Sequence, residues 1–144
     1  MISGSNKKEV LSILLLCISV VWALAVIMSD RKDIPVHIDV MGQVDAVASK
    51  WNILIMPATA IFVYALLSFF QSHPEYCNLP SFPEKVDRAN LVRKLLLILK
   101  LFSILLLVGI EVTIILYPLL TLWIVIGVFI LGSWVFYREM KNKN

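Results

Sequence analysis

Four side chains in this sequence have the chemistry of a cation or proton site. His37, Asp39 and Asp45 lie within nine residues of one another, and Glu111 lies inside a long apolar block. Imidazole nitrogens and carboxylate oxygens are ligands of transition metals and of hard cations. If the segment that carries the first three residues folds back over the helix that carries Glu111, the four side chains can form one binding site. Because His-x-Asp pairs are also frequent by chance, we predict no resident metal and no other cofactor.

Two other interpretations of the same residues stay open. In the simpler one, which we take as the default, His37 and Asp45 hydrogen-bond the backbone of their own loop, and Glu111 is uncharged and bonded to another helix. In the other one, Glu111 relays a proton with His37 as its partner, because carboxyl groups inside apolar helices of membrane proteins are commonly functional.

The residues that enzymes use as nucleophiles and bases do not form a recognisable pair. Only two histidines are present, and Ser49 and Ser68 are expected at opposite ends of one helix. The two cysteines, Cys17 and Cys77, lack CxxC spacing, and the histidines lack the HExxH spacing of zinc enzymes. We therefore predict no catalytic residue, and no disulfide between cysteines that lie at different membrane depths.

The elements that must position these residues are apolar helices. The chain has 144 residues, of which 60% are hydrophobic and 16% are charged, and its mean hydropathy is +0.87. Soluble domains are about half apolar and about a quarter charged, so this composition excludes an ordinary soluble domain. We predict an integral membrane protein, in which the net charge of +3 reflects orientation in the bilayer and not an attraction to nucleic acid.

Long apolar blocks define four predicted membrane spans. The blocks 10–28 and 51–70 are each about 30 Å long as helices, which matches the hydrocarbon core of a bilayer. The block 95–137 is about twice as long, and Tyr117-Pro118 places an interfacial aromatic and a helix breaker near its middle. The predicted fold is an all-α bundle of four transmembrane helices in a single domain, with a structured outer loop after the first helix. Its parts are the spans 10–28, 51–70, 95–115 and 119–137, the outer loop 29–50 and the cytoplasmic connection 71–94.

Basic residues predict how the chain is oriented. Nine Lys and Arg side chains lie at the two termini and in the second connection, against three in the first loop. Positive residues favour the cytoplasmic side, so both termini are expected in the cytoplasm and the loop 29–50 outside. The first helix also resembles a signal peptide cleaved after Ala23-Leu24-Ala25. Its apolar run continues to Met28, however, and we prefer an uncleaved span.

Residues inside the spans and the loop predict local packing. Ser12, Ser19 and Ala23 form a narrow stripe of small residues, which predicts a close helix contact. Lys100 is expected to extend its ammonium to the lipid headgroups, and Pro57 is expected to kink the second span.

The loop is expected to be ordered. Its apolar positions Val36, Ile38 and Val40 alternate with polar ones, as in a short extended segment whose apolar face lies on the helix ends. Gly42 predicts a turn after this segment.

The order of motifs in the two connections resembles a known family. The first connection reads Ile34-Pro35-x-His37, Gly42-x-x-Asp45 and Ser49-Lys50-Trp51, leading into the span that holds Pro57, and the second reads His73-Pro74 followed by Asn78-x-Pro80 and a basic helix. Together these motifs are similar to a bacterial domain-of-unknown-function family that also forms the front part of SdpI-type immunity proteins, which protect a cell from a secreted toxin. The likeness covers about residues 34–115.

The resemblance implies a bacterial cytoplasmic-membrane protein and carries over no catalytic residues, because the family at large has no established activity. We therefore expect a non-enzymatic binding, sensing or immunity-type protein, whose partners are the lipid bilayer and other membrane proteins or further copies of itself. The alternative is a small carrier that uses Glu111 as an intramembrane proton or cation site. Four spans without an internal repeat would then require an oligomer or a larger partner.

Overall fold

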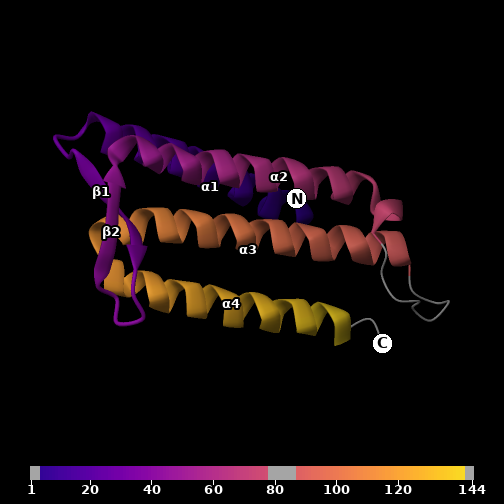
Figure 1. The fold of residues 1–144 in the computed structure, drawn as a ribbon. Helices are drawn as coiled ribbons and strands as arrows, with labels where there is room; N and C mark the ends of the chain where they lie inside the picture. The colour runs from indigo at the N-terminus through magenta and orange to yellow at the C-terminus, as the bar shows by residue number, and fades with distance from the viewer. Residues whose placement is uncertain (1–3, 78–86, 142–144) are drawn as a thin grey trace.

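The computed structural model describes residues 4–77 and 87–141 of the chain, which form four long helices and one β-hairpin (Figure 1). Each helix, the second together with the 3-10 turn that leads into it, is long and apolar enough to cross a membrane, as the sequence predicts. Two short 3-10 helices flank the second long helix. The helices are α1 (Gly4–Met28), α2 (Ile55–Ser72), α3 (Arg88–Leu116) and α4 (Pro118–Lys141), and the 3-10 helices are η1 (Lys50–Leu54) and η2 (Pro74–Tyr76).

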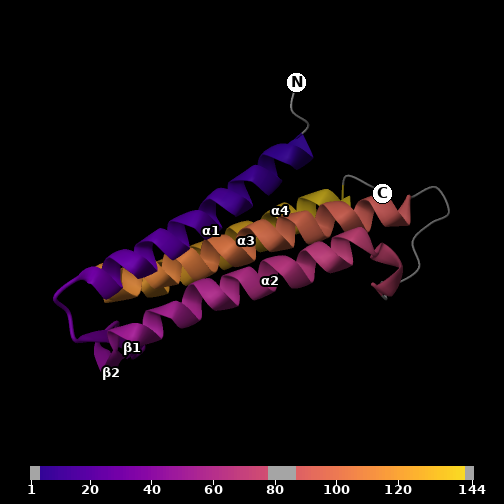
Figure 2. The same cartoon turned by 90° about the horizontal axis from the view of Figure 1, so that it is seen from above.

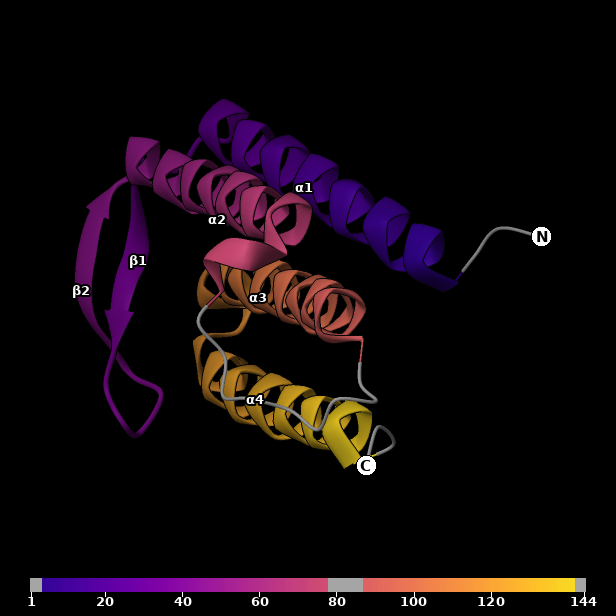
Figure 3. The same ribbon diagram turned by 90° about the vertical axis from the view of Figure 1, so that its right-hand side faces the viewer.

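The third helix is the centre of the structure. It packs against α1, α2 and α4, whereas α4 contacts mainly α3. The helices α1 and α2 lie together on one side of α3, and α4 lies on its opposite side, so the four helices do not form a closed square (Figures 2 and 3). Most buried residues of the described chain consequently lie on α3, while Thr121 is the buried residue of α4. On α1, the predicted stripe of small residues is confirmed, because Ser12, Ser19 and Ala23 are all fully buried.

The break within the long apolar block lies where the sequence predicts it. The third helix ends at Leu116, and Tyr117 alone separates it from Pro118, the first residue of α4. The amide of Tyr117 donates to the carbonyl of Thr113 at 2.7 Å and closes the last turn of α3. Proline is favoured at the first position of a helix because the missing N–H has no partner there in any case. The chain therefore reverses direction within a single residue.

The outer loop is ordered, as predicted, but it contains two strands instead of one extended segment. The strands β1 (Asp33–Ile38) and β2 (Val44–Ser49) pair antiparallel, with register shifts on either side of His37. The turn between them contains Gly42 with φ +79°, a left-handed conformation that favours glycine. Within this turn, one carboxylate oxygen of Asp39 accepts from the amides of Met41 and Gln43, each at 2.8 Å.

The register shifts change which side chains of β1 face the helices. The strict alternation predicts Val36, Ile38 and Val40 on the helix ends, whereas Val36 and Val40 are exposed. The residues that pack inward are Ile34, which belongs to the buried core, and Ile38, which packs against it. The prediction was wrong for Val36 because this residue lies at the register shift between Pro35 and His37, and it was wrong for Val40 because this residue lies in the turn beyond the end of β1.

The hairpin lies across one end of the helices, from α2 towards α4 (Figures 1 and 3). At its base, the Lys50 ammonium donates to the carbonyl of Ser29 at 2.9 Å. At its tip, a Cβ added to Gly42 would lie 2.9 Å from the Cα of Leu119 and 2.5 Å from that residue's Cδ1. The hairpin is thus held at its base by a hydrogen bond and at its tip by close packing of its backbone against the start of α4.

Most of the motif residues predicted in the two connections lie at the two ends of α2. Trp51 is exposed in η1. Pro57 is buried in the first turn of α2, just after the chain changes from 3-10 helix to α-helix. The expected kink inside a continuous α-helix is therefore replaced by this change of helix type at the start of α2. His73 caps the C-terminal end of α2 and Pro74 begins η2, whereas Asn78 and Pro80 lie outside the described residues. Pro35 lies in β1.

Candidate functional site

The four predicted binding residues do not form one site. Asp39 is used by the turn of the hairpin, and His37 contacts Asp45, whereas Glu111 is fully buried on α3 and accepts from the hydroxyl of Ser19 on α1. In the described ranges, no three His, Cys, Asp or Glu side chains are grouped closely enough to hold a metal ion. The structure therefore does not meet the condition for a shared cation site, because Glu111 faces a neighbouring helix and the other three residues lie on the hairpin.

His37 and Asp45 form a pair on the surface of the hairpin. The His37 Nδ1 and the Asp45 Oδ1 are 2.5 Å apart, and the two side chains are 67% and 46% exposed. The default interpretation placed these residues against the loop backbone, and it is wrong in this detail because the antiparallel strands bring the two side chains together. An exposed ion pair of this kind contributes only about 0–1 kcal/mol to stability, so both groups remain accessible to a partner.

Glu111 lies in the interface between α1 and α3. Its Oε2 accepts from Ser19, as the interpretation of a bond to another helix predicts, while its Oε1 is buried and has no hydrogen-bond partner among the described residues. The indole nitrogen of Trp22, three residues beyond Ser19 on α1, is also buried and has no hydrogen-bond partner among the described residues. Among the described residues, Glu111 thus offers an unused acceptor in this interface, and Trp22 offers an unused donor on α1. Buried polar groups without partners are rare and often indicate a site.

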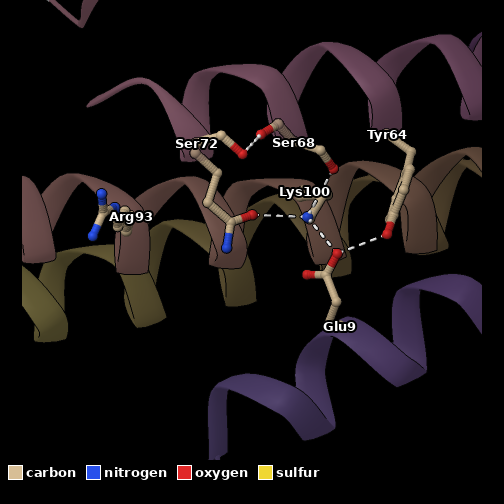
Figure 4. A pocket seen from close by; sticks show the side chains of 7 residues that line it. Glu9, Tyr64, Ser68, Ser72, Arg93 and Lys100 are labelled. Atoms are coloured by element: carbon tan, nitrogen blue, oxygen red, sulfur yellow. Dashed lines mark hydrogen bonds and ion pairs between the residues drawn. The ribbon is translucent and has the colours of Figure 1, made fainter. Parts of the chain in front are cut away.

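Lys100 contradicts the prediction that its ammonium extends to the headgroups. The side chain is 1% exposed and lies between α1, α2 and α3 (Figure 4). Its three N–H groups donate to the Glu9 Oε1 at 2.8 Å, the Ser68 Oγ at 3.0 Å and the Gln71 Oε1 at 2.8 Å. Since every donor is used, burial avoids the large cost of an unpaired charge.

Tyr64 completes this cluster. Its hydroxyl donates to the same Glu9 oxygen at 2.7 Å, and the Lys100 ammonium lies 4.7 Å from the centre of its ring. A cation over an aromatic face is a favourable arrangement.

A cavity of about 600 Å³ opens beside this cluster, and we call it the Lys100 cavity. Its lining combines polar residues from the first three helices. They are Glu9, Tyr64, Ser68, Gln71, Ser72, Arg93 and Lys100. Most of these residues were not predicted as site residues, although Tyr64, Ser68 and Gln71 recur at i, i+4 and i+7 in an apolar helix, which is the signal of a polar stripe.

The two polar clusters lie at different levels of the same interface. Glu9 faces Lys100 and Ser19 faces Glu111, and ten helical residues separate the α1 members by about 15 Å. Between the levels, α3 contributes the buried side chains of Ile104 and Val108. The space among the first three helices thus has two polar levels with apolar packing between them.

Comparison with protein-family models, with curated proteins and with solved structures finds no match to this chain. The resemblance drawn from the loop motifs therefore stays a prediction.

Proposed function

We propose that this chain is a non-enzymatic multi-pass protein of the bacterial cytoplasmic membrane, which binds a molecule on the outer side through the hairpin β1–β2, as a sensing or immunity-type protein. Both termini would lie in the cytoplasm. The observation that carries the proposal is the attachment of the hairpin at its base through Lys50 and at its tip through Gly42. A segment that is fixed in this way presents a binding surface without a large ordering cost.

The outer surface of the hairpin has the composition of a contact surface. The exposed pair His37–Asp45 provides charge and hydrogen bonding. Around it, large apolar side chains of the hairpin are exposed, including Val40 at 87%, Met41 at 72% and Val47 at 62%. Such apolar groups together with polar ones are typical of interaction sites.

The resemblance to the family that precedes SdpI-type immunity proteins supports an immunity-type role for this surface. A growth assay tests it. A bacterial host that expresses the chain is challenged with a panel of secreted membrane-active peptide toxins, and wild type is compared with Asp45→Ala and His37→Ala. We expect protection against at least one toxin that both variants lose while they still insert. A matched control is Glu75→Ala, which removes an exposed carboxylate at the other end of α2.

The orientation has its own test. In a chain with Cys17→Ser and Cys77→Ser, Val40→Cys in the hairpin turn and Glu75→Cys beyond α2 place single thiols at opposite ends of the helices. A membrane-impermeant maleimide is expected to label the first in intact cells and the second only after lysis. The reverse pattern would contradict the proposed sidedness.

A second candidate is a small oligomeric carrier, and a specific observation favours it. The Oε1 of Glu111 is buried without a partner in the described chain, as expected of a group that binds a proton or cation in transit. In proteoliposomes this function predicts flux of protons or alkali cations that Glu111→Gln stops and Glu75→Gln leaves unchanged. Absence of flux for all these cations would remove the carrier.

A further inference from the structure

The strand β2 has an open outer edge. At the base of the hairpin, the amide of Lys50 donates to the carbonyl of Lys32 at 3.0 Å. Hydrogen-bonded and non-hydrogen-bonded pairs alternate along an antiparallel ladder. The pair Pro35–Val47 lies three positions further along, so it is a non-hydrogen-bonded pair, and Val47 directs its N–H and C=O groups away from β1. Pro35 agrees with this assignment, because a proline has no N–H to give to the ladder.

The outer edge of β1 is less open than that of β2. Pro35 lacks an N–H there, and β1 contacts α3 and η1, whereas β2 contacts chiefly β1. In Figure 3, β2 lies on the side of β1 that faces away from α3. Within residues 4–77 and 87–141, the main chain of Val47 has no hydrogen bond to a segment outside the hairpin. Proteins commonly protect such an edge with proline or lysine, and β2 contains neither. The edge of β2 therefore offers a main-chain donor and acceptor to another extended chain.

A pocket of about 330 Å³ lies at the base of the hairpin, and we call it the hairpin pocket. Its volume is at the lower end of the range for small-ligand pockets. Mainly apolar side chains from both strands, η1, α2 and α3 line it, among them Ile34, Ala48, Ile53, Met56 and Ile114. Ala48 follows Val47 on β2, so the pocket lies beside the open edge. An apolar side chain is the group that such a lining accepts.

We propose that β2 binds an extended peptide as a third strand, and that a large apolar side chain of this peptide enters the hairpin pocket. In this mode of recognition, main-chain hydrogen bonds provide affinity and pockets for alternate side chains provide specificity. Neighbouring strands lie about 4.8 Å apart, so a side chain opposite Ala48 lies on the pocket face, one strand spacing from the lining. The inference rests on the proposed function, whose outer ligand it identifies as an extended peptide.

The residues around the edge favour a peptide over a second copy of this chain. By the alternation of side chains, Ala46 and Ala48 lie on the pocket face of β2. A second β2 paired to this edge would bring the same small side chains beside the pocket and leave most of it empty. A peptide with large apolar side chains at alternate positions fills it. Such a peptide also runs past Asp45, whose exposed pair with His37 can bind a polar group of the ligand.

Peptide binding to the protein in nanodiscs tests the proposal. The probe is a short synthetic peptide of alternating leucine and threonine, with a lysine at each end for solubility, and empty nanodiscs give the background. One comparison peptide carries N-methyl groups on its central amides and cannot donate hydrogen bonds from them. The other comparison peptide has alanine in place of leucine. Fluorescence anisotropy is expected to show that wild type binds the probe about tenfold more tightly than either comparison peptide.

Val47→Pro removes the outward N–H without removing a hydrogen bond between the strands, because Val47 pairs with Pro35 at a non-hydrogen-bonded position. It is expected to weaken binding of the probe by about tenfold. The matched control is Gln43→Ala, which shortens an exposed side chain just before β2 and keeps every main-chain N–H. This control is expected to leave binding unchanged. If Val47→Pro fails to fold, the N-methylated peptide decides the same question on wild type.

Hydrogen exchange adds a readout that a general attraction to apolar peptides does not move. The probe is expected to slow exchange of the Val47 amide in wild type and to leave the Ala48 amide, which faces β1, unchanged. Slow exchange at Val47 without peptide would show that a second copy already covers the edge, and it would overturn the proposal. Unchanged exchange at Val47 in the presence of bound probe would overturn it as well.

Equal binding of the probe and either comparison peptide would contradict strand addition, and so would equal losses in Val47→Pro and Gln43→Ala. The growth assay with secreted toxins separates this inference from the proposed function. Protection by wild type that Val47→Pro loses and Gln43→Ala keeps supports both. Wild type without protection contradicts the proposed function itself, whereas protection that persists in Val47→Pro contradicts this inference alone.

Discussion

The Lys100 ammonium and the Glu9 carboxylate lie 2.8 Å apart between α1 and α3, and the lysine side chain is 1% exposed. This pair joins the first helix to the third across 91 positions of sequence. Because Ser68 and Gln71 of α2 bind the same ammonium, a single side chain connects three helices. Loss of this ammonium would remove a hydrogen bond from Glu9, Ser68 and Gln71, and loss of any of these acceptors would leave one N–H group of the buried ammonium unpaired.

Removal of Glu9 should destabilise the protein more than joint removal of the pair. Glu9→Ala leaves the buried ammonium without its counter-charge, which typically costs about 3–5 kcal/mol, and partial exposure of Glu9 favours the lower end. The double variant Glu9→Gln with Lys100→Met is expected to recover most of the loss. Thermal unfolding in detergent measures both. A double variant as unstable as Glu9→Ala would show that the pair's charge balance is not the cause.

Ser19→Ala is expected to lower stability by about 1–3 kcal/mol, because Glu111 then loses its hydrogen bond and keeps a fully buried carboxyl group. The chain offers a matched control in Ser12→Ala, since Ser12 is equally buried but its hydroxyl donates to the carbonyl of Lys8 on its own helix. The measurement is again thermal unfolding in detergent. Equal effects of the two substitutions would contradict the proposed dependence of Glu111 on Ser19.

Gly42→Ala is expected to displace the tip of the hairpin from α4. Alanine is disfavoured at φ +79° by about 1–2 kcal/mol, and its Cβ would also meet the backbone of Leu119. Gly127→Ala is the control, because a Cβ at this helical position meets nothing within 4 Å. Hydrogen exchange of the hairpin amides is expected to accelerate in the first variant only. Unchanged exchange in Gly42→Ala would mean that the tip is not held by α4.

Substitution of the surface pair should separate binding from folding. His37→Ala and Asp45→Ala are each expected to change stability by less than about 1 kcal/mol, since both side chains are exposed. A double-mutant cycle measured by thermal unfolding at low and at high salt gives their coupling energy, which should fall as salt rises. A larger, salt-independent coupling would show that the pair stabilises the hairpin, and loss of function in these variants could then not be assigned to binding.

The helices follow from properties that each segment carries on its own. Unbroken apolarity over the length of a bilayer, and a proline that cannot continue a helix, are local, so the four helices and the break at Tyr117 were predictable. The buried face of α1 was predictable for the same reason, because Ser12, Ser19 and Ala23 repeat with the helical period. Gly42 likewise indicated a turn without reference to the rest of the chain.

The contents of the polar clusters were decided by contacts between segments far apart in the sequence. Which face of α3 meets α1 depends on the rotation of both helices, and this rotation directs Glu111 to Ser19 instead of to the hairpin. Lys100 is long enough to reach either solvent or the interior, and the presence of Glu9, Ser68 and Gln71 within reach decides for the interior. The pairing of β1 with β2 shifts the register around His37 and so changes which side chains face outward. Composition and hydrophobic period can be judged along the chain, whereas the partner of a buried polar group depends on distances between segments in the folded structure.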